Sequence, residues 1–98
     1  MNEKKQDLPE KIKAVKSDSP MRSFDPKKTE DYTKLSKLQV KCFEILDEND
    51  LPFGAVRGLY LAGTQMGGLE LRADHDPGVE LPEEINDILN DVEVELIE

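Results

Sequence analysis

The sequence lacks the features that mark secreted and membrane proteins. Its 98 residues include one cysteine, Cys42, which cannot form an internal disulfide bond. Small secreted domains are usually cross-linked by several disulfides, so we expect a reducing, cytoplasmic environment. Lys4 and Lys5 are followed by no apolar stretch of the kind found in a signal peptide, and no apolar run reaches the roughly 20 residues of a membrane span. These absences predict a protein that is neither exported through such a signal nor inserted in a membrane.

The sequence also lacks a recognisable catalytic or metal-binding pattern. Its only histidine, His75, lies between Asp74 and Asp76, and three adjacent residues in a turn cannot all converge on one metal ion. Cys42 falls on the apolar side of a predicted helix, where a thiol is expected to be inert. Nucleophilic catalysis needs an activated Ser, Cys or Thr with a base in reach, and no such pair is indicated. We therefore expect no catalytic residue, no metal site and no cofactor.

Basic residues become scarce toward the C-terminus. Residues 1–34 carry nine Lys or Arg and seven acids (net +2), whereas residues 35–98 carry four and fifteen (net −11), which together give the overall −9. A body of this charge is repelled by nucleic-acid phosphates and by anionic membranes, and it is attracted by basic proteins. The two segments of opposite net charge are also expected to attract each other.

Large apolar side chains are scarce in residues 1–28, which are rich in Lys, Glu, Asp and Ser and include three prolines. A segment of this composition cannot offset its own ordering entropy, so we predict a flexible, disordered N-terminal arm. Within it, Leu8, Ile12 and Val15 lie at helical spacing, and lysines surround them. These three residues form a candidate motif that folds on a partner, and a solvated tail is the alternative interpretation.

Residues 29–98 carry the patterns of one compact acidic α+β domain. An apolar stripe with capping residues predicts a helix from Thr29, or from Asp25, to near Asn49. The runs 55–62 and 69–74 flank a glycine-rich loop and predict an antiparallel hairpin. Pro82 opens a second helix that ends near residue 90, and residues 92–97 alternate as a last strand.

The predicted order is therefore helix, strand, strand, helix, strand. A two-layer fold, in which one three-stranded sheet carries both helices on one face, buries every apolar stripe of these elements. Such a sheet has two open edges, and pairing through an edge strand or a helix makes a homodimer possible.

The strongest remaining feature is the acidic C-terminal region, in which no Lys or Arg follows Arg72. Three acids of the predicted second helix are spaced i, i+4, i+8, opposite its apolar side. Two acids of the last strand share its outer face about 7 Å apart, a spacing close to that of phosphates along a nucleic-acid strand. These five residues are the candidate partner-binding surface: Glu83, Asp87, Asp91, Glu93 and Glu95.

The leading functional hypothesis is a non-catalytic protein-interaction module, of inhibitor or adaptor type, that docks this acidic surface on a basic protein. One alternative is a nucleic-acid- or ribosome-associated protein that contacts RNA or DNA through its lysine-bearing arm. Another is small-ligand binding at the loop Gly63–Gly68, whose backbone N–H groups can hold an anion although the spacing matches neither a P-loop nor a dinucleotide site. The structural alternative for the acids is that they keep a small surface soluble.

Overall fold

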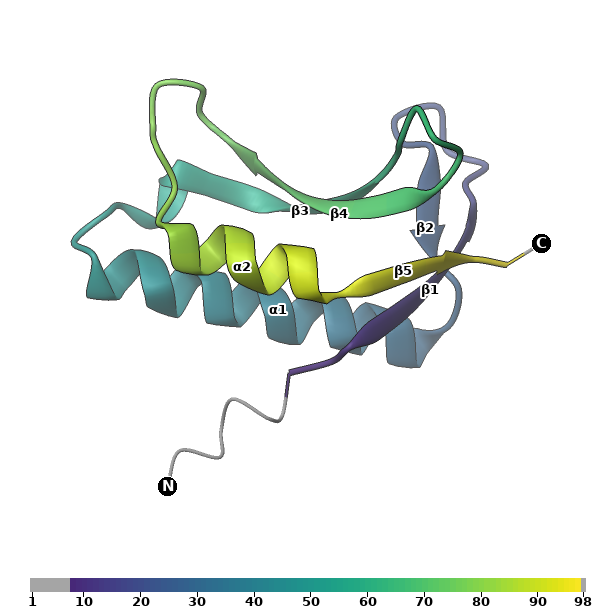
Figure 1. The fold of residues 1–98 in the computed structure, drawn as a ribbon, viewed down its shortest axis with the longest axis horizontal. Helices are drawn as coiled ribbons and strands as arrows, with labels where there is room; N and C mark the ends of the chain where they lie inside the picture. The colour runs from purple at the N-terminus through teal and green to yellow at the C-terminus, as the bar shows by residue number, and fades with distance from the viewer. Residues whose placement is uncertain (1–7, 98) are drawn as a thin grey trace.

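A computed structural model describes residues 8–97, which form an α+β fold with two helices and five strands in two sheets (Figure 1). In chain order, the elements are β1 (Lys11–Lys16), β2 (Phe24–Pro26), α1 (Thr29–Glu48), a 3-10 turn η2 (Phe53–Ala55), β3 (Val56–Gly63), β4 (Leu69–His75), α2 (Glu83–Asp91) and β5 (Glu93–Leu96). The predicted α+β class is confirmed, and so are both predicted helices and the hairpin.

Helix α1 follows the predicted apolar stripe from its middle to its C-terminus. Its fully buried residues recur at helical spacing, whereas Tyr32, near the start of the helix, is 47% exposed. The helix ends where the Asn49 side-chain amide donates to the Ile45 carbonyl at 2.8 Å and Asp50 takes a positive φ of 59°. A left-handed residue cannot continue a right-handed helix, so α1 stops there. The buried apolar residues of α1 are Leu38, Cys42, Ile45 and Leu46.

The β3–β4 hairpin pairs antiparallel, as predicted, with an irregularity in register between Val56 and Gly58. Leu61 lies opposite Leu71 on the inner, buried face, while Tyr60 lies opposite Arg72 on the outer face. Figure 1 shows α1 and α2 on the same side of this hairpin. The inner leucines therefore bury their side chains against both helices.

Strand β5 has a different partner from the one predicted. It pairs in parallel with β1, and the three-stranded sheet has the order β2-β1-β5, while β3 and β4 form a separate two-stranded sheet. The prediction of one three-stranded sheet made from the hairpin and the last strand is therefore wrong. The cause is β1, whose backbone pairs with β5. The residues of β1 belong to the segment predicted to be a flexible arm, so this partner for β5 was not expected.

The prediction of a flexible arm over residues 1–28 is likewise wrong for β1 and β2. Ile12 and Ala14 are fully buried and alternate with exposed Lys11 and Lys13, which is the period of a strand. β1 is hydrogen-bonded on both sides, antiparallel to β2 and parallel to β5, so its ordering is stabilised by two neighbouring strands. Residues 1–7 of the predicted arm lie outside the described residues.

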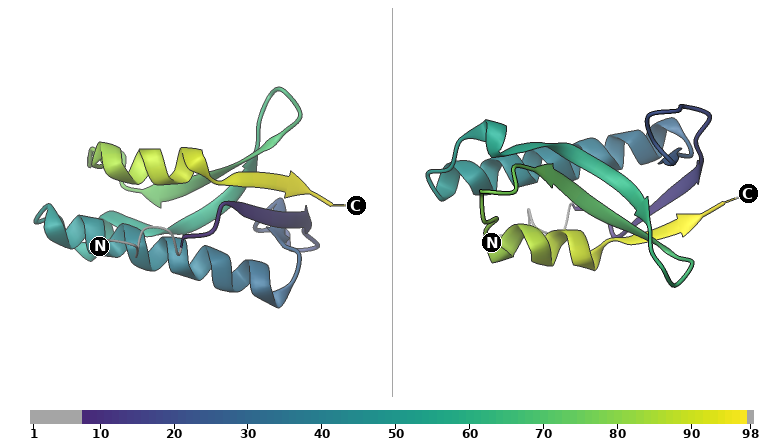
Figure 2. Two further views of the ribbon diagram at one scale, coloured as in Figure 1. Left: turned by 60° about the horizontal axis from the view of Figure 1, so that its bottom comes forward. Right: turned by 90° about the horizontal axis from the view of Figure 1, so that it is seen from above.

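The core lies where α1, α2, the inner face of the hairpin and β1 meet. Figure 2 shows the arrangement of these elements from two further directions. Asp31 joins this core to the start of α1. It is 1% exposed, and its two carboxylate oxygens accept the backbone N–H groups of Lys13 in β1 (3.0 Å) and Lys28 at the helix N-terminus (3.2 Å). One buried side chain therefore fixes the central strand to the longer helix.

Candidate functional site

Helix α2 presents the acidic residues that the sequence selected. Ile85 and Leu89 are buried, and Glu83, Asp87 and Asp91 are exposed. At a rise of about 1.5 Å per residue, acids four positions apart are separated by about 6 Å along the helix axis. Within the described part of the chain, five acids in and just before α2 make no ion pair: Glu80, Glu83, Glu84, Asp87 and Asp91.

The two acids of β5 have a different environment because β1 lies beside them. Lys11 Nζ is 2.8 Å from Glu95 Oε1 and 4.0 Å from Glu93 Oε2. The hydrogen bond and the charge of Lys11 lower the pKa of the Glu95 carboxyl, and Glu95 in turn raises the pKa of Lys11. The five predicted residues thus divide into three uncompensated acids on α2 and two partly neutralised acids on β5.

This ion pair also bears on the lysines of the predicted arm. The opposite net charges of the N-terminal and C-terminal segments predict that they attract each other, and the ion pair between Lys11 and Glu95 of β5 is one such attraction. Lys13 and Lys27 add to the positive field that lowers the pKa of Glu95. Some of the arm lysines that were considered for contacts with RNA or DNA phosphates therefore already lie next to carboxylates of the same chain.

The candidate arm motif Leu8, Ile12 and Val15 is not a helix face. Ile12 is fully buried in β1, Val15 lies in the same strand, and Leu8 is half-buried against the core. A residue at 0% exposure cannot also contact a partner without unfolding β1, so Ile12 is not available to a partner in this fold, whereas a partner role for Leu8 and Val15 stays a prediction.

The Gly63–Gly68 loop uses much of its hydrogen-bonding capacity internally. The N–H groups of Gly67 and Gly68 donate to the backbone carbonyl (3.1 Å) and the hydroxyl (3.1 Å) of Thr64, and Thr64 N–H donates to the Gly68 carbonyl (2.9 Å). Gly67 has a φ of 88°, which a side chain would strain. Donors already engaged in this way are not available to cradle an anion, so the geometry is that of a hairpin loop.

The Asp74-His75-Asp76 segment is held by a partner that the sequence did not indicate. The Arg57 guanidinium donates to Asp76 Oδ1 at 2.6 Å and to Asp74 Oδ1 at 3.2 Å. These residues meet only because β3 pairs with β4 in one particular register, so no local sequence signal identifies the arrangement. No group of three or more potential metal ligands occurs within residues 8–97.

Cys42 lies in the core on α1 and is fully buried. Burial raises the pKa of the Cys42 thiol to about 11. Because the thiolate is the nucleophilic form of cysteine, this environment suppresses reactivity near neutral pH.

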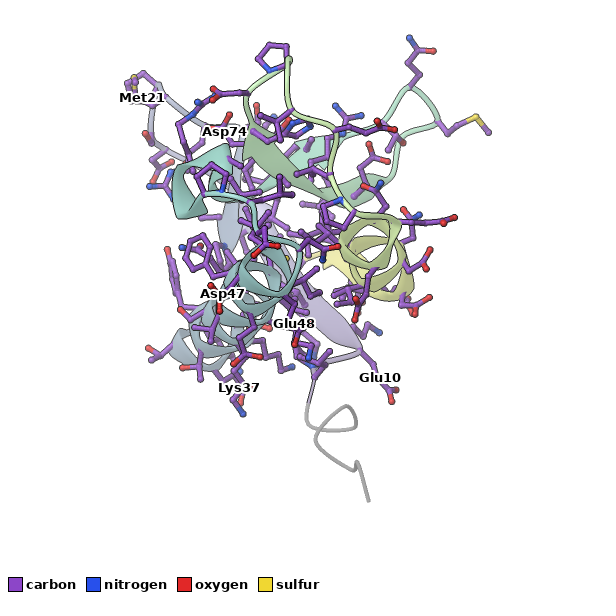
Figure 3. All side chains as sticks on the ribbon, turned by 90° about the vertical axis from the view of Figure 1, so that its left-hand side faces the viewer. Glu10, Met21, Lys37, Asp47, Glu48 and Asp74 are labelled. Carbon is purple, nitrogen blue, oxygen red and sulfur yellow. The ribbon has the colours of Figure 1, made fainter. Side chains whose placement is uncertain are left out.

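A groove of about 660 Å³ runs beside β3. The stretch from Arg57 to Gly63 forms one wall, and the remaining lining comes from the segment 21–24 with Pro26, from Leu35 of α1 and from Asp74 of β4. Figure 3 shows Met21 and Asp74 together on this side of the molecule, above α1, whereas α2 lies on the other side. No sequence pattern indicates this groove, because it depends on the placement of the β1–β2 connection next to the hairpin.

No family model, curated protein or solved structure was found to match this chain. Neither helix in the described residues has the length and apolar character needed to span a bilayer.

Proposed function

We propose that the protein is a non-catalytic interaction module, an inhibitor or an adaptor, that docks the exposed face of α2 on a basic protein. One observation carries the proposal: the acids in and before α2 are without ion pairs among the described residues, while β5 has its own lysine. Uncompensated charges on a rigid helix give a partner both attraction at a distance and a fixed spacing to match.

The five candidate residues are expected to contribute unequally to partner binding, because their electrostatic environments differ. Glu83, Asp87 and Asp91 lie at the centre of the proposed docking surface, because nothing in the described structure competes for them. Glu93 and Glu95 lie at its margin, because a partner's basic groups must compete there with Lys11. Charge reversal on α2 is therefore expected to weaken binding more than reversal on β5.

The proposal is tested with three full-length baits. The first is the wild-type chain, the second carries E83K/D87K/D91K, and the third carries D18K/D47K/E48K. Each triple changes the net charge by +6, from −9 to −3. Asp47 and Glu48 lie on α1 (Figure 3), and all three control residues are exposed and without ion pairs in the described structure.

Each bait is incubated with native lysate at low and at high salt, and the retained proteins are identified by mass spectrometry. We expect a basic protein that is retained at low salt by the wild type and by the control triple, and that is lost from the α2 triple and at high salt. Equal retention by the two triples would show that charge alone, and not the α2 surface, governs binding.

A further inference from the structure

The unpaired edge of β3 lacks the features with which proteins usually protect strand edges. Among residues 8–97, β3 pairs only with β4. The strand Val56–Gly63 has eight residues, contains no proline or lysine, and carries one charged side chain, Arg57. A long apolar edge of this kind is a template for another strand.

The other strand edges are protected. β2 has three residues and ends in Pro26, which has no N–H to donate. β5 carries Glu93 and Glu95, and residues of α2, including Asn86 and Leu89, line the space beside β4. The edge of β3 is therefore the least protected strand edge in the described structure, although the segment 21–24 flanks it across the groove and Phe24 lies close to Gly63 at its end.

The charge of the groove favours a second copy of this chain. A protein of net charge −9 associates with itself only through a face where that charge is absent. Each arginine that lines the β3 groove is compensated within the chain, because Arg22 pairs with Asp25 (3.1 Å) and Arg57 pairs with Asp74 (3.2 Å) and Asp76 (2.6 Å). Because α2 lies on the opposite side of the molecule (Figure 3), two copies that meet at β3 keep their acidic helices apart.

The pattern of β3 is also complementary to itself. In an antiparallel pair, residues directly opposite each other share a face, so a two-fold axis must pass beside a residue and not between two residues. An axis at Tyr60, the centre of the groove wall, places Tyr60 opposite its counterpart on the outer face and Leu59 opposite Leu61 on the inner face. Gly58 then lies opposite Ala62, which leaves room for the two tyrosine rings.

We infer that a second copy of the chain occupies this groove, with the two β3 strands antiparallel and centred on Tyr60, so that both hairpins form one four-stranded sheet. The two Arg57 side chains then lie at opposite ends of the pair, about 20 Å apart for six residues at about 3.3 Å each. That separation exceeds the Debye length of about 8 Å at physiological salt, so their repulsion is screened. The dimer does not use α2, whose docking role is a separate proposal.

Sedimentation velocity of the full chain tests the inference. The chain mass is 11.1 kDa, so a dimer has twice that mass, 22.2 kDa. Because the contact is a strand with its groove and not a broad apolar face, we expect a dissociation constant in the micromolar range and a shift from monomer to dimer over about 1–500 μM. A wild-type chain that remains monomeric at about 1 mM would overturn the inference.

Substitution at the centre of the pair locates the interface. Tyr60 is 43% exposed, and Y60K places two lysines opposite each other, so we expect a monomer at every concentration tested. The control M66K adds the same charge at a residue that is 93% exposed in the hairpin loop, and it is expected to dimerise like the wild type. A dimer in Y60K, or a monomer in M66K, would contradict the proposed register.

Two readouts keep the test independent of any loss of folding in Y60K. Mixing Y60K with Y60E places opposite charges across the axis and should restore a 22.2 kDa species that neither variant forms alone. In the wild type, amide hydrogen exchange from Arg57 to Gly63 should slow as the concentration rises through the dimer transition. Failure of the mixture to dimerise, or exchange in this segment that is independent of concentration, would count against β3 as the interface.

Discussion

Asp31 is the one charged residue that is buried in the described structure, and its replacement tests how β1 is fixed to α1. Each carboxylate oxygen accepts one backbone N–H, from Lys13 at 3.0 Å and from Lys28 at 3.2 Å. A hydrogen bond to a charged group contributes about 1.5–3 kcal/mol, and a donor left without a partner adds a desolvation cost. Taking the lower end for these partly buried donors, D31A should lower the free energy of unfolding by about 3 kcal/mol.

That loss is large for a chain of 98 residues, whose total stability is expected to be about 5–15 kcal/mol. It corresponds to a decrease in Tm of about 12–24 °C, since 1 kcal/mol shifts Tm by about 4–8 °C at this size. D31N retains one acceptor oxygen and should lose about half as much. Urea unfolding at pH 7, followed by far-UV circular dichroism, measures both variants.

The matched control is E30A, which removes the neighbouring acid in the same helical turn. Glu30 is exposed and makes no ion pair within the described residues, so E30A should change stability by less than about 0.5 kcal/mol. If D31A were as stable as E30A, the reasoning that Asp31 fastens the central strand to the helix would be refuted.

Three further changes test the burial and the ion pair described above. I12A should cost about 2–4 kcal/mol in urea unfolding because Ile12 is fully buried in β1, whereas a flexible arm predicts no effect. Cys42, with its pKa near 11, should remain unmodified by a disulfide reagent at pH 8 in the native protein and react after unfolding in urea; rapid native labelling would contradict its burial. Lys11 lowers the folded-state pKa of Glu95, so this pair stabilises the fold above the unfolded pKa of about 4.3, and its contribution disappears as pH falls through the lower folded value. The difference in stability between wild type and E95Q should therefore be present at pH 7, begin to fall below the unfolded pKa of about 4.3, and be lost below the lowered folded pKa of Glu95; a difference that did not decrease with acidification would disagree.

The elements that local patterns describe well were predictable from the sequence. The stripe from Leu38 to Leu46 defines α1, and the alternation from Leu69 to Ala73 with a glycine-rich loop before it defines the hairpin. In each case the period of burial matches the period of the backbone, so a single segment contains the signal. The acids of α2 were found for the same reason, because i, i+4 spacing is itself a helical property.

The strand β1 was missed because its signal is short and its stability is not local. Ile12 and Ala14 are the two buried residues of a six-residue strand, within a composition typical of disorder. They are ordered by hydrogen bonds to β2 and by the parallel pairing with β5, about 80 residues away in sequence. The pairing of Lys11 with Glu95 follows from that register, so the division of the acidic surface was not predictable before the sheet was known.

The affinity of the captured basic partner for the two triple variants tests the central claim most directly. At physiological salt, three surface charges at about 0.5–1 kcal/mol each amount to about 1.5–3 kcal/mol. We therefore expect E83K/D87K/D91K to raise the dissociation constant about 10- to 150-fold in isothermal titration calorimetry, while D18K/D47K/E48K, with the same net charge, changes it by less than about threefold. Equal dissociation constants for the two variants would contradict the proposal that the partner docks on α2.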